Sequence, residues 1–248
     1  MRSDVKVPQL QVEHYIDQSS GEPSARFLWN GLLLQAIEVT GKNISRLEGL
    51  TLIDKDLHNA KKWLEKAHAL SKTQEVPEVS TETYIASKDR EIFDDVKAYF
   101  VAAVTFYGKA FTEANGRHAQ MQTDWLDKEF RSAHIELMDL RHNFAAHSGD
   151  MQLEKVRTRV LLIPSKNGIE PKLHHQRVQP DSTFTSSDGK NYIDLISHAI
   201  SVVTERHRKL KDRLGDIVYS YPPQFWELVA KSSTPLDLDR EYRAKKKK

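Results

Sequence analysis

Apolar residues recur at intervals of three and four through most of the chain, the spacing that places side chains on one face of a helix. The pattern predicts helices over residues 24–40, 54–70, 87–113, 124–148 and 193–217. The last of these repeats its apolar positions with heptad spacing from Ile193 to Ile217. That helix therefore either closes a helical bundle or presents a surface to a partner.

Two extended runs interrupt the helical pattern, at residues 156–163 and 169–178. Asn167-Gly168 lies between them, and this dipeptide favours a tight turn between antiparallel strands. The expected fold class is mainly α: a helical bundle with a β-hairpin insertion at about 156–178 and a long C-terminal helix. The predicted parts are an N-terminal arm at 1–23, the helical domain at 24–218 and a C-terminal tail at 219–248.

The composition limits the classes of protein to which the chain can belong. It has 248 residues, 39% of them hydrophobic, which is enough for a buried core, and a net charge of only +2. It has no cysteine, which excludes disulfides and thiolate zinc sites. No apolar run approaches the roughly 18 residues of a membrane span, and residues 1–18 lack a hydrophobic signal region. We therefore expect a cytoplasmic protein with no membrane partner.

The predicted fourth helix ends in Arg141-His142-Asn143, followed by His147 and by Gly149, which stops the helix. On a helical wheel Arg141 and His147 lie about 60° to either side of the apolar stripe, so they flank the core without entering it. They are about 9 Å apart along the helix axis. Asn143 lies four residues before His147, on the same face.

This ending resembles the Arg-x(4-6)-His motif of HEPN domains, in which a polar residue directly follows the Arg. The resemblance is clearest over about residues 89–150. HEPN families are small helical bundles, and many are metal-independent ribonucleases that work as dimers in toxin–antitoxin and abortive-infection systems. The Ala146-His147 ending is most similar to the abortive-infection group.

The resemblance implies an endoribonuclease in which the RNA 2′-hydroxyl attacks the phosphate and a 2′,3′-cyclic phosphate is left. His147 would act as acid or base, because the pKa of imidazole lies near neutrality. Arg141 would stabilise the phosphoryl oxygens through its bidentate fork, and His142 and Asn143 would orient the scissile group. No cofactor and no metal are expected. The expected partners are RNA, a second copy that brings its own motif into the same cleft, and a neutralising protein.

Three alternatives stay open. Arg141 and His147 could simply edge the core, with His147 stabilised near a helix C-terminus. The protein could be a noncatalytic HEPN-like module that binds a nucleotide, RNA or a protein. It could also be a scaffold that uses the helix from Ile193 to Ile217.

The remaining polar residues carry weaker signals. His174 and His175 point to opposite faces of a predicted strand and cannot bind one ion together. His207 lies on the heptad stripe at the core edge, whereas Asp237 and Asp239 are predicted to be solvated in a polar tail, and Lys245–Lys248 to be a disordered end. The motifs of zincins, P-loop proteins and Rossmann folds are absent from the sequence.

Overall fold

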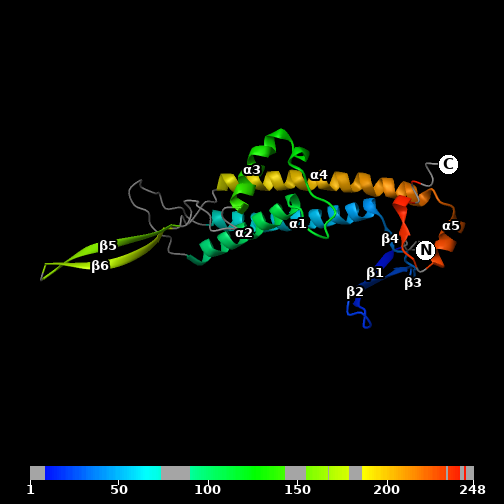
Figure 1. Ribbon diagram of the computed structural model, residues 1–248, viewed down its shortest axis with the longest axis horizontal. Helices are drawn as coiled ribbons and strands as arrows, with labels where there is room; N and C mark the ends of the chain where they lie inside the picture. The colour runs from blue at the N-terminus through cyan, green and yellow to red at the C-terminus, as the bar shows by residue number, and fades with distance from the viewer. Residues whose placement is uncertain are drawn as a thin grey trace, which may run out of the picture. The chain divides into compact units, whose positions relative to one another are not determined.

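The computed structural model describes residues 9–73, 90–142, 155–166, 168–178, 186–232, 234–240 and 243 (Figure 1). The chain divides into two compact units, one of residues 46–210 and one of residues 1–45 with 211–248. Across the described residues helices predominate, so the predicted mainly-α class is confirmed. Two long helices, α1 (Lys42–Lys72) and α4 (Ser186–Tyr219), have residues in each unit.

Residues 46–210 contain a helical core built on the apolar stripe of α1. The stripe residues are completely buried, as the spacing predicts: Leu57, Ala60, Leu64 and Ala67. The helix begins 12 residues before the predicted start at residue 54, at Lys42. Buried Leu50 and Ile53 extend the stripe in that direction, which explains the longer helix.

Helix α4 packs antiparallel to α1. His207 Nε2 lies 3.1 Å from Thr51 Oγ1, and the Thr204 hydroxyl donates to Asp54 Oδ1 at 3.3 Å. The heptad stripe is buried in the bundle, with Ile196 and Val203 inaccessible to solvent. The sequence allowed two roles for this helix, and in the structure it closes the bundle.

Helix α2 (Arg90–Phe111) lies against α1, where the Tyr99 ring stacks on Trp63 with centroids 5.5 Å apart. Its most buried residues are Phe100, Ala103, Val104, Tyr107 and Ala110. The prediction of a helix over 87–113 is confirmed within the described residues.

The predicted fourth helix is only partly present. Residues 123–130 form two short 3₁₀ turns, η1 (Thr123–Trp125) and η2 (Lys128–Phe130), and the α-helix α3 covers Arg131–Leu140. The early start predicted at residue 124 is wrong, because Leu126 and Asp127 are extended between the two turns. Contacts with α4 hold these turns: the Arg206 guanidinium lies 3.7 Å from the centroid of the Trp125 ring.

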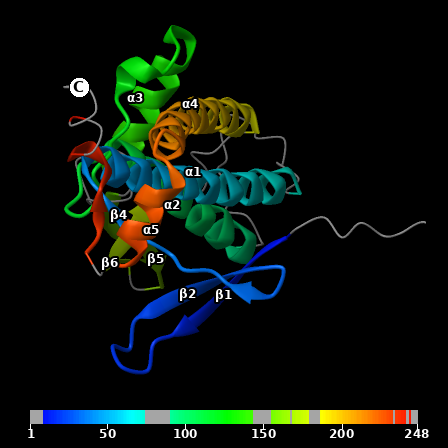
Figure 2. The same ribbon diagram turned by 90° about the vertical axis from the view of Figure 1, so that its right-hand side faces the viewer.

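The N-terminal residues form a sheet where the sequence predicted an arm and a helix. Strands β1 (Leu10–Ile16), β2 (Pro23–Trp29) and β3 (Leu32–Leu33) pair antiparallel in that order (Figure 2). The helix predicted over 24–40 is therefore wrong. Asn30 and Gly31 have φ values of 50° and 81°, the backbone of a tight hairpin turn, and a helix cannot pass through it.

The C-terminal segment is structured in the same unit. It contains α5 (Pro223–Ala230) and β7 (Leu236–Asp237), which pairs in parallel with β4 (Val39–Thr40). Asp239 Oδ2 accepts a hydrogen bond from the Asn43 backbone N–H at the start of α1, and Asp237 Oδ1 accepts one from the Arg240 N–H. The prediction that both carboxylates are merely solvated is wrong. Lys245–Lys248 lie outside the described residues.

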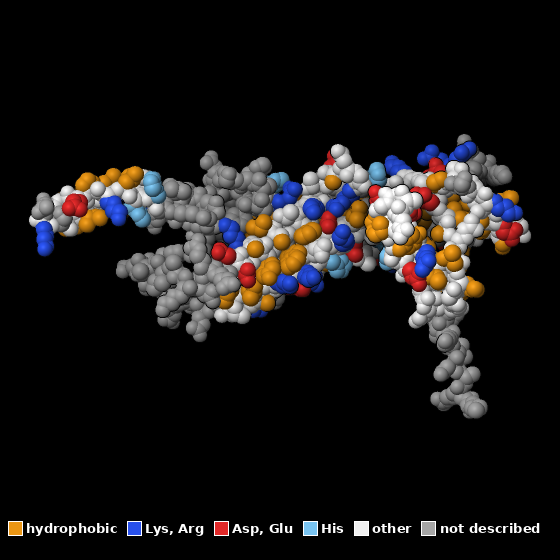
Figure 3. All heavy atoms as spheres, turned by 90° about the horizontal axis from the view of Figure 1, so that it is seen from below, with side chains coloured by type: hydrophobic (Ala, Val, Ile, Leu, Met, Phe, Trp, Pro, Cys, Tyr) orange, Lys and Arg blue, Asp and Glu red, His pale blue; other side chains and the backbone are white. Residues whose placement is uncertain are grey.

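The predicted hairpin insertion is confirmed. Strands β5 (Lys155–Ser165) and β6 (Gly168–Val178) pair antiparallel along their whole length, from Lys155 opposite Val178 to Ser165 opposite Gly168. Gly168 has a positive φ of 117°, as a tight turn requires. Hydrophobic side chains gather along one side of this ribbon (Figure 3).

Candidate functional site

The Arg141 to His147 motif begins at the C-terminal end of α3. The Arg141 backbone N–H bonds to the carbonyls of both Leu137 and Met138, and the helix widens into a π turn at Arg141 and His142. Such turns often occur at functional positions. The described segment ends there, so Asn143 and His147 lie outside the described residues.

Arg141 is half-buried and His142 is exposed, which agrees with the prediction that the motif flanks the core. The Arg141 side chain lies directly on Gly108 of α2, where a Cβ atom would be 2.0 Å from Arg141 Cδ and 2.4 Å from Nε. Gly108 is buried near the C-terminal end of α2, and glycine within a helix costs about 1 kcal/mol relative to alanine. The missing side chain makes room for Arg141, and this accounts for glycine at that position.

A buried histidine, His134, fixes α3 against α2. Its side chain is 5% exposed, and its Nδ1 lies 2.8 Å from the Tyr107 hydroxyl. On its other side Nε2 lies 3.1 Å from Thr123 Oγ1. The Phe111 ring packs on the imidazole with centroids 4.4 Å apart. Both ring nitrogens therefore have partners, and the residue acts as a positioning group on the helix that carries Arg141.

Burial controls the protonation of this cluster. It lowers the pKa of His134, so the imidazole is neutral near pH 7. It raises the pKa of Tyr107, so the phenol keeps its proton and can donate to His134. His134 and Arg141 are seven residues apart and share one face of α3, so the neutral cluster also sets the rotation that points Arg141 at Gly108.

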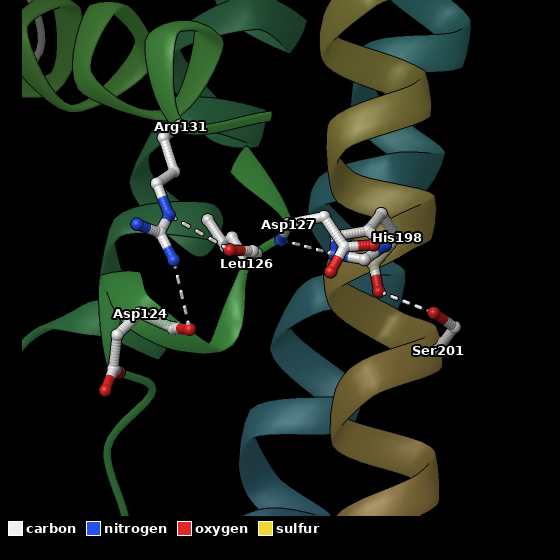
Figure 4. Close-up of polar contacts among 6 residues, drawn as sticks. All are labelled: Asp124, Leu126, Asp127, Arg131, His198 and Ser201. Atoms are coloured by element: carbon white, nitrogen blue, oxygen red, sulfur yellow. Dashed lines mark hydrogen bonds and ion pairs between the residues drawn. The ribbon is translucent and has the colours of Figure 1, made fainter. Parts of the chain in front are cut away.

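The segment before α3 is anchored on α4 (Figure 4). The Asp127 backbone N–H donates to His198 Nε2 at 3.2 Å, and the Phe130 ring stacks on the same imidazole at 4.4 Å. Arg131 Nε donates to the Leu126 carbonyl at 3.1 Å, which closes the turn on itself. These contacts fix the start of α3, just as His134 fixes its middle.

Sequence reasoning missed Gly108, His134 and His198. The signal for His134 was present, because Phe130, His134, Leu137 and Arg141 follow the four-three-four spacing of a single helix face. A histidine on such a face must find buried partners. Nothing in the sequence indicated a role for Gly108, because that role depends on which side chain from another helix packs against it.

The other histidines noted in the sequence show no catalytic grouping. His174 pairs with Arg159 and His175 with Thr158 across the ribbon, so the two point to opposite faces, as predicted. His207 contacts Thr51 at the core edge. Among the described residues no group of three or more His, Asp or Glu is placed to hold a metal ion.

One apolar hollow of about 670 Å³ lies in the unit that contains α5. Its lining includes Ile37, Tyr221 and Trp226, with Glu227 as the charged member. One carboxylate among apolar and aromatic side chains does not provide an acid–base pair. We therefore regard the Arg141 to His147 motif, and not this hollow, as the candidate catalytic site.

No family model, no curated protein and no solved structure matches this chain. In the part of the chain that the structure describes, no helix has the length and apolar character needed to cross a bilayer.

Proposed function

We propose that the protein is a metal-independent endoribonuclease of the HEPN type. The observation that carries the proposal is Arg141, the first residue of the motif, which ends α3 in a π turn and lies on Gly108 beside the exposed His142. A half-buried arginine whose side chain is packed against a neighbouring helix is preorganised for a phosphate.

In the proposed reaction the RNA 2′-hydroxyl attacks the adjacent phosphorus and the bond to the 5′-oxygen breaks. His147 transfers the protons, and Arg141 stabilises the charge that builds on the nonbridging oxygens. His142 and Asn143 orient the scissile phosphate. The products are a 2′,3′-cyclic phosphate and a 5′-hydroxyl, and neither step needs a metal ion or a cofactor.

The proposal includes a homodimer. Arg141 and His147 are separated by about 9 Å along an ideal helix, which is too far for both to contact one phosphate comfortably. A twofold axis beside the motif would place the Arg of one copy near the His of the other. In the same proposal the protein is a cytoplasmic defence or toxin effector that a neutralising protein holds in check.

The experiment compares cleavage of a labelled structured RNA by the wild type, Arg141→Ala, Arg141→Lys and His147→Ala. Both alanine variants should lose at least 100-fold in rate, since each removes a group that acts in the transition state. Arg141→Lys should recover only part of the rate, because lysine lacks the bidentate fork. The control is His118→Ala, an exposed histidine outside the motif.

Full cleavage by either alanine variant would refute the proposal. RNA binding without any product, unchanged by His147→Ala, would instead favour the noncatalytic HEPN-like binding module.

A further inference from the structure

The β5–β6 ribbon is strongly basic. Residues 155–178 contain six Lys or Arg and one Asp or Glu, a net charge of +5. The other 224 residues contain 31 Lys or Arg and 34 Asp or Glu, a net charge of −3. Residues 240–248, at the C-terminal end, carry a net charge of +5 as well. The ribbon differs from that end in that its strand register places the cations, and a surface with many cations and few carboxylates is typical of one that binds a polyanion.

The strand register sorts the ribbon into two unlike faces. Cross-strand partners share a face, and successive residues alternate between faces. One face carries four exposed polar side chains: Arg157, Arg159, Lys172 and His174. On this face Arg159 lies opposite His174, and Lys172 lies opposite Leu161. We call this the basic face. Its described carboxylate is Glu170, opposite Ile163 near the turn.

The opposite face has no charged residue between the pair Thr158–His175 and the pair Pro164–Ile169. It is apolar instead, and the side chains of Val160, Leu162, Ile169 and Leu173 are 58–67% exposed. By register Arg177 belongs to this apolar face, whereas Lys155, Arg157, Arg159 and Lys172 share the basic face. Because most of the cations lie on the basic face, we expect a polyanion to bind there.

The spacing of the basic face suits a chain of phosphates. Arg157 and Arg159 are about 6.8 Å apart along the strand, two residues of an antiparallel strand. Lys172 is diagonal to Arg159 across the ladder, about 7–8 Å away. The three cations therefore form a row that can contact successive phosphates, and both arginines can bind a phosphate bidentately.

We propose that the basic face of the β5–β6 ribbon binds the sugar-phosphate backbone of RNA. The choice of RNA among polyanions rests on the proposed ribonuclease function, and binding here does not depend on sequence. The ribbon holds the strand while the motif at the end of α3 cuts it.

The test uses RNA in which every 2′-hydroxyl is methylated, because this RNA lacks the attacking group and binding can be measured on the intact wild-type chain. Its affinity is measured by fluorescence anisotropy between about 50 and 200 mM salt. The test variant is Arg157→Gln/Arg159→Gln/Lys172→Gln. The matched control, Arg46→Gln/Lys211→Gln/Arg213→Gln, removes the same charges from exposed helical positions.

A plot of log K against log salt concentration has a negative slope, of about −0.7 per phosphate contact for a single strand. If the basic face makes three such contacts, their loss makes the slope less negative by about 2. The wild type should then lose about 20-fold more affinity than the test variant over this fourfold change in salt. The control variant should keep the wild-type slope. The charge-preserving variant Arg157→Lys/Arg159→Lys should bind more weakly than the wild type, because lysine lacks the bidentate fork, but should keep the wild-type salt slope, which separates charge from ribbon folding.

Equal slopes for the test variant and the wild type would overturn the proposal, as would equal losses in the test and control variants. A DNA strand of the same sequence that binds at least as tightly as the RNA would overturn the choice of RNA. Since none of these measurements involves cleavage, an inactive enzyme with intact ribbon binding would refute the proposed ribonuclease and leave this inference standing.

Discussion

At the scale of single residues, the position of the candidate site depends on how two side chains of α3 contact α2. His134 is buried between Tyr107 and Thr123, and Arg141, two turns later, lies on Gly108. The first contact sets the rotation of the helix, and the second places the guanidinium. Sequence reasoning identified Arg141 from its motif but could not find the glycine beneath it, because that contact joins residues far apart in the chain.

Gly108→Ala should reduce activity without unfolding the protein. The new methyl group would meet the outer part of a flexible arginine, so Arg141 would move away rather than α2. Helix propensity alone favours the substitution by about 1 kcal/mol. We therefore expect an unchanged or slightly higher melting temperature and a fall in kcat of at least tenfold for RNA cleavage.

The matched control for that variant is Gly215→Ala in α4, where the nearest atom to a new Cβ is 3.8 Å away. It should gain stability in the same way and keep full activity. Wild-type kcat in Gly108→Ala would show that the contact with Arg141 does not matter for catalysis.

His134 should make stability depend on pH. Burial lowers its pKa in the folded state below the ordinary value of 6.5, so the unfolded chain binds this proton more tightly. Its contribution is therefore complete above about pH 6.5 and is lost as the pH falls below that value. In urea titrations at several pH values, the free energy of unfolding should fall more steeply from pH 7 to pH 5 in the wild type than in His134→Gln.

Parallel curves for the wild type and His134→Gln would mean that His134 does not titrate as its burial implies.

At the scale of elements, a helix or strand could be predicted from the sequence where its residue pattern fitted only one kind of secondary structure. The stripes of α1, α2 and α4 are buried as predicted, and Asn167-Gly168 separates two real strands. Asn30-Gly31 is the same dipeptide, but the apolar residues around it also fit helical spacing, so the pattern predicts a helix where the structure has a sheet. The 3₁₀ turns before α3 could not be foreseen, since contacts with α4 stabilise them.

A buried ion pair joins α1 to the segment after α2. Arg117 contacts Asp56 Oδ2, and the two side chains are only 14% and 8% exposed. Removal of one partner leaves the other charge buried, so Arg117→Met should lower the free energy of unfolding by about 3–5 kcal/mol. The double variant Asp56→Leu/Arg117→Met should recover most of that loss, because an apolar pair of similar size replaces the charges.

Denaturant unfolding of the two single variants, the double variant and the wild type gives the coupling energy directly. If the effects of Asp56→Leu and Arg117→Met simply add, the pair does not hold these elements together.

At the scale of the whole molecule, the mainly-α class and the hairpin insertion followed from the sequence. The structured C-terminal segment did not, because the parallel β4–β7 pair and the Asp239 cap both depend on contacts between the two ends of the chain. The proposed function combines a motif at the end of α3 with a basic ribbon, in which the first cuts RNA and the second binds it.

The chemistry of the cleaved ends is the sharpest test of the proposed ribonuclease. Purified wild type is incubated with a labelled structured RNA in excess EDTA beside His147→Ala, and the products are analysed by mass spectrometry. We expect fragments with 2′,3′-cyclic phosphates and 5′-hydroxyls from the wild type and none from the variant. Cleavage by the wild type only after Mg²⁺ is added, 3′-hydroxyl ends, or several RNAs left intact would refute the metal-independent mechanism.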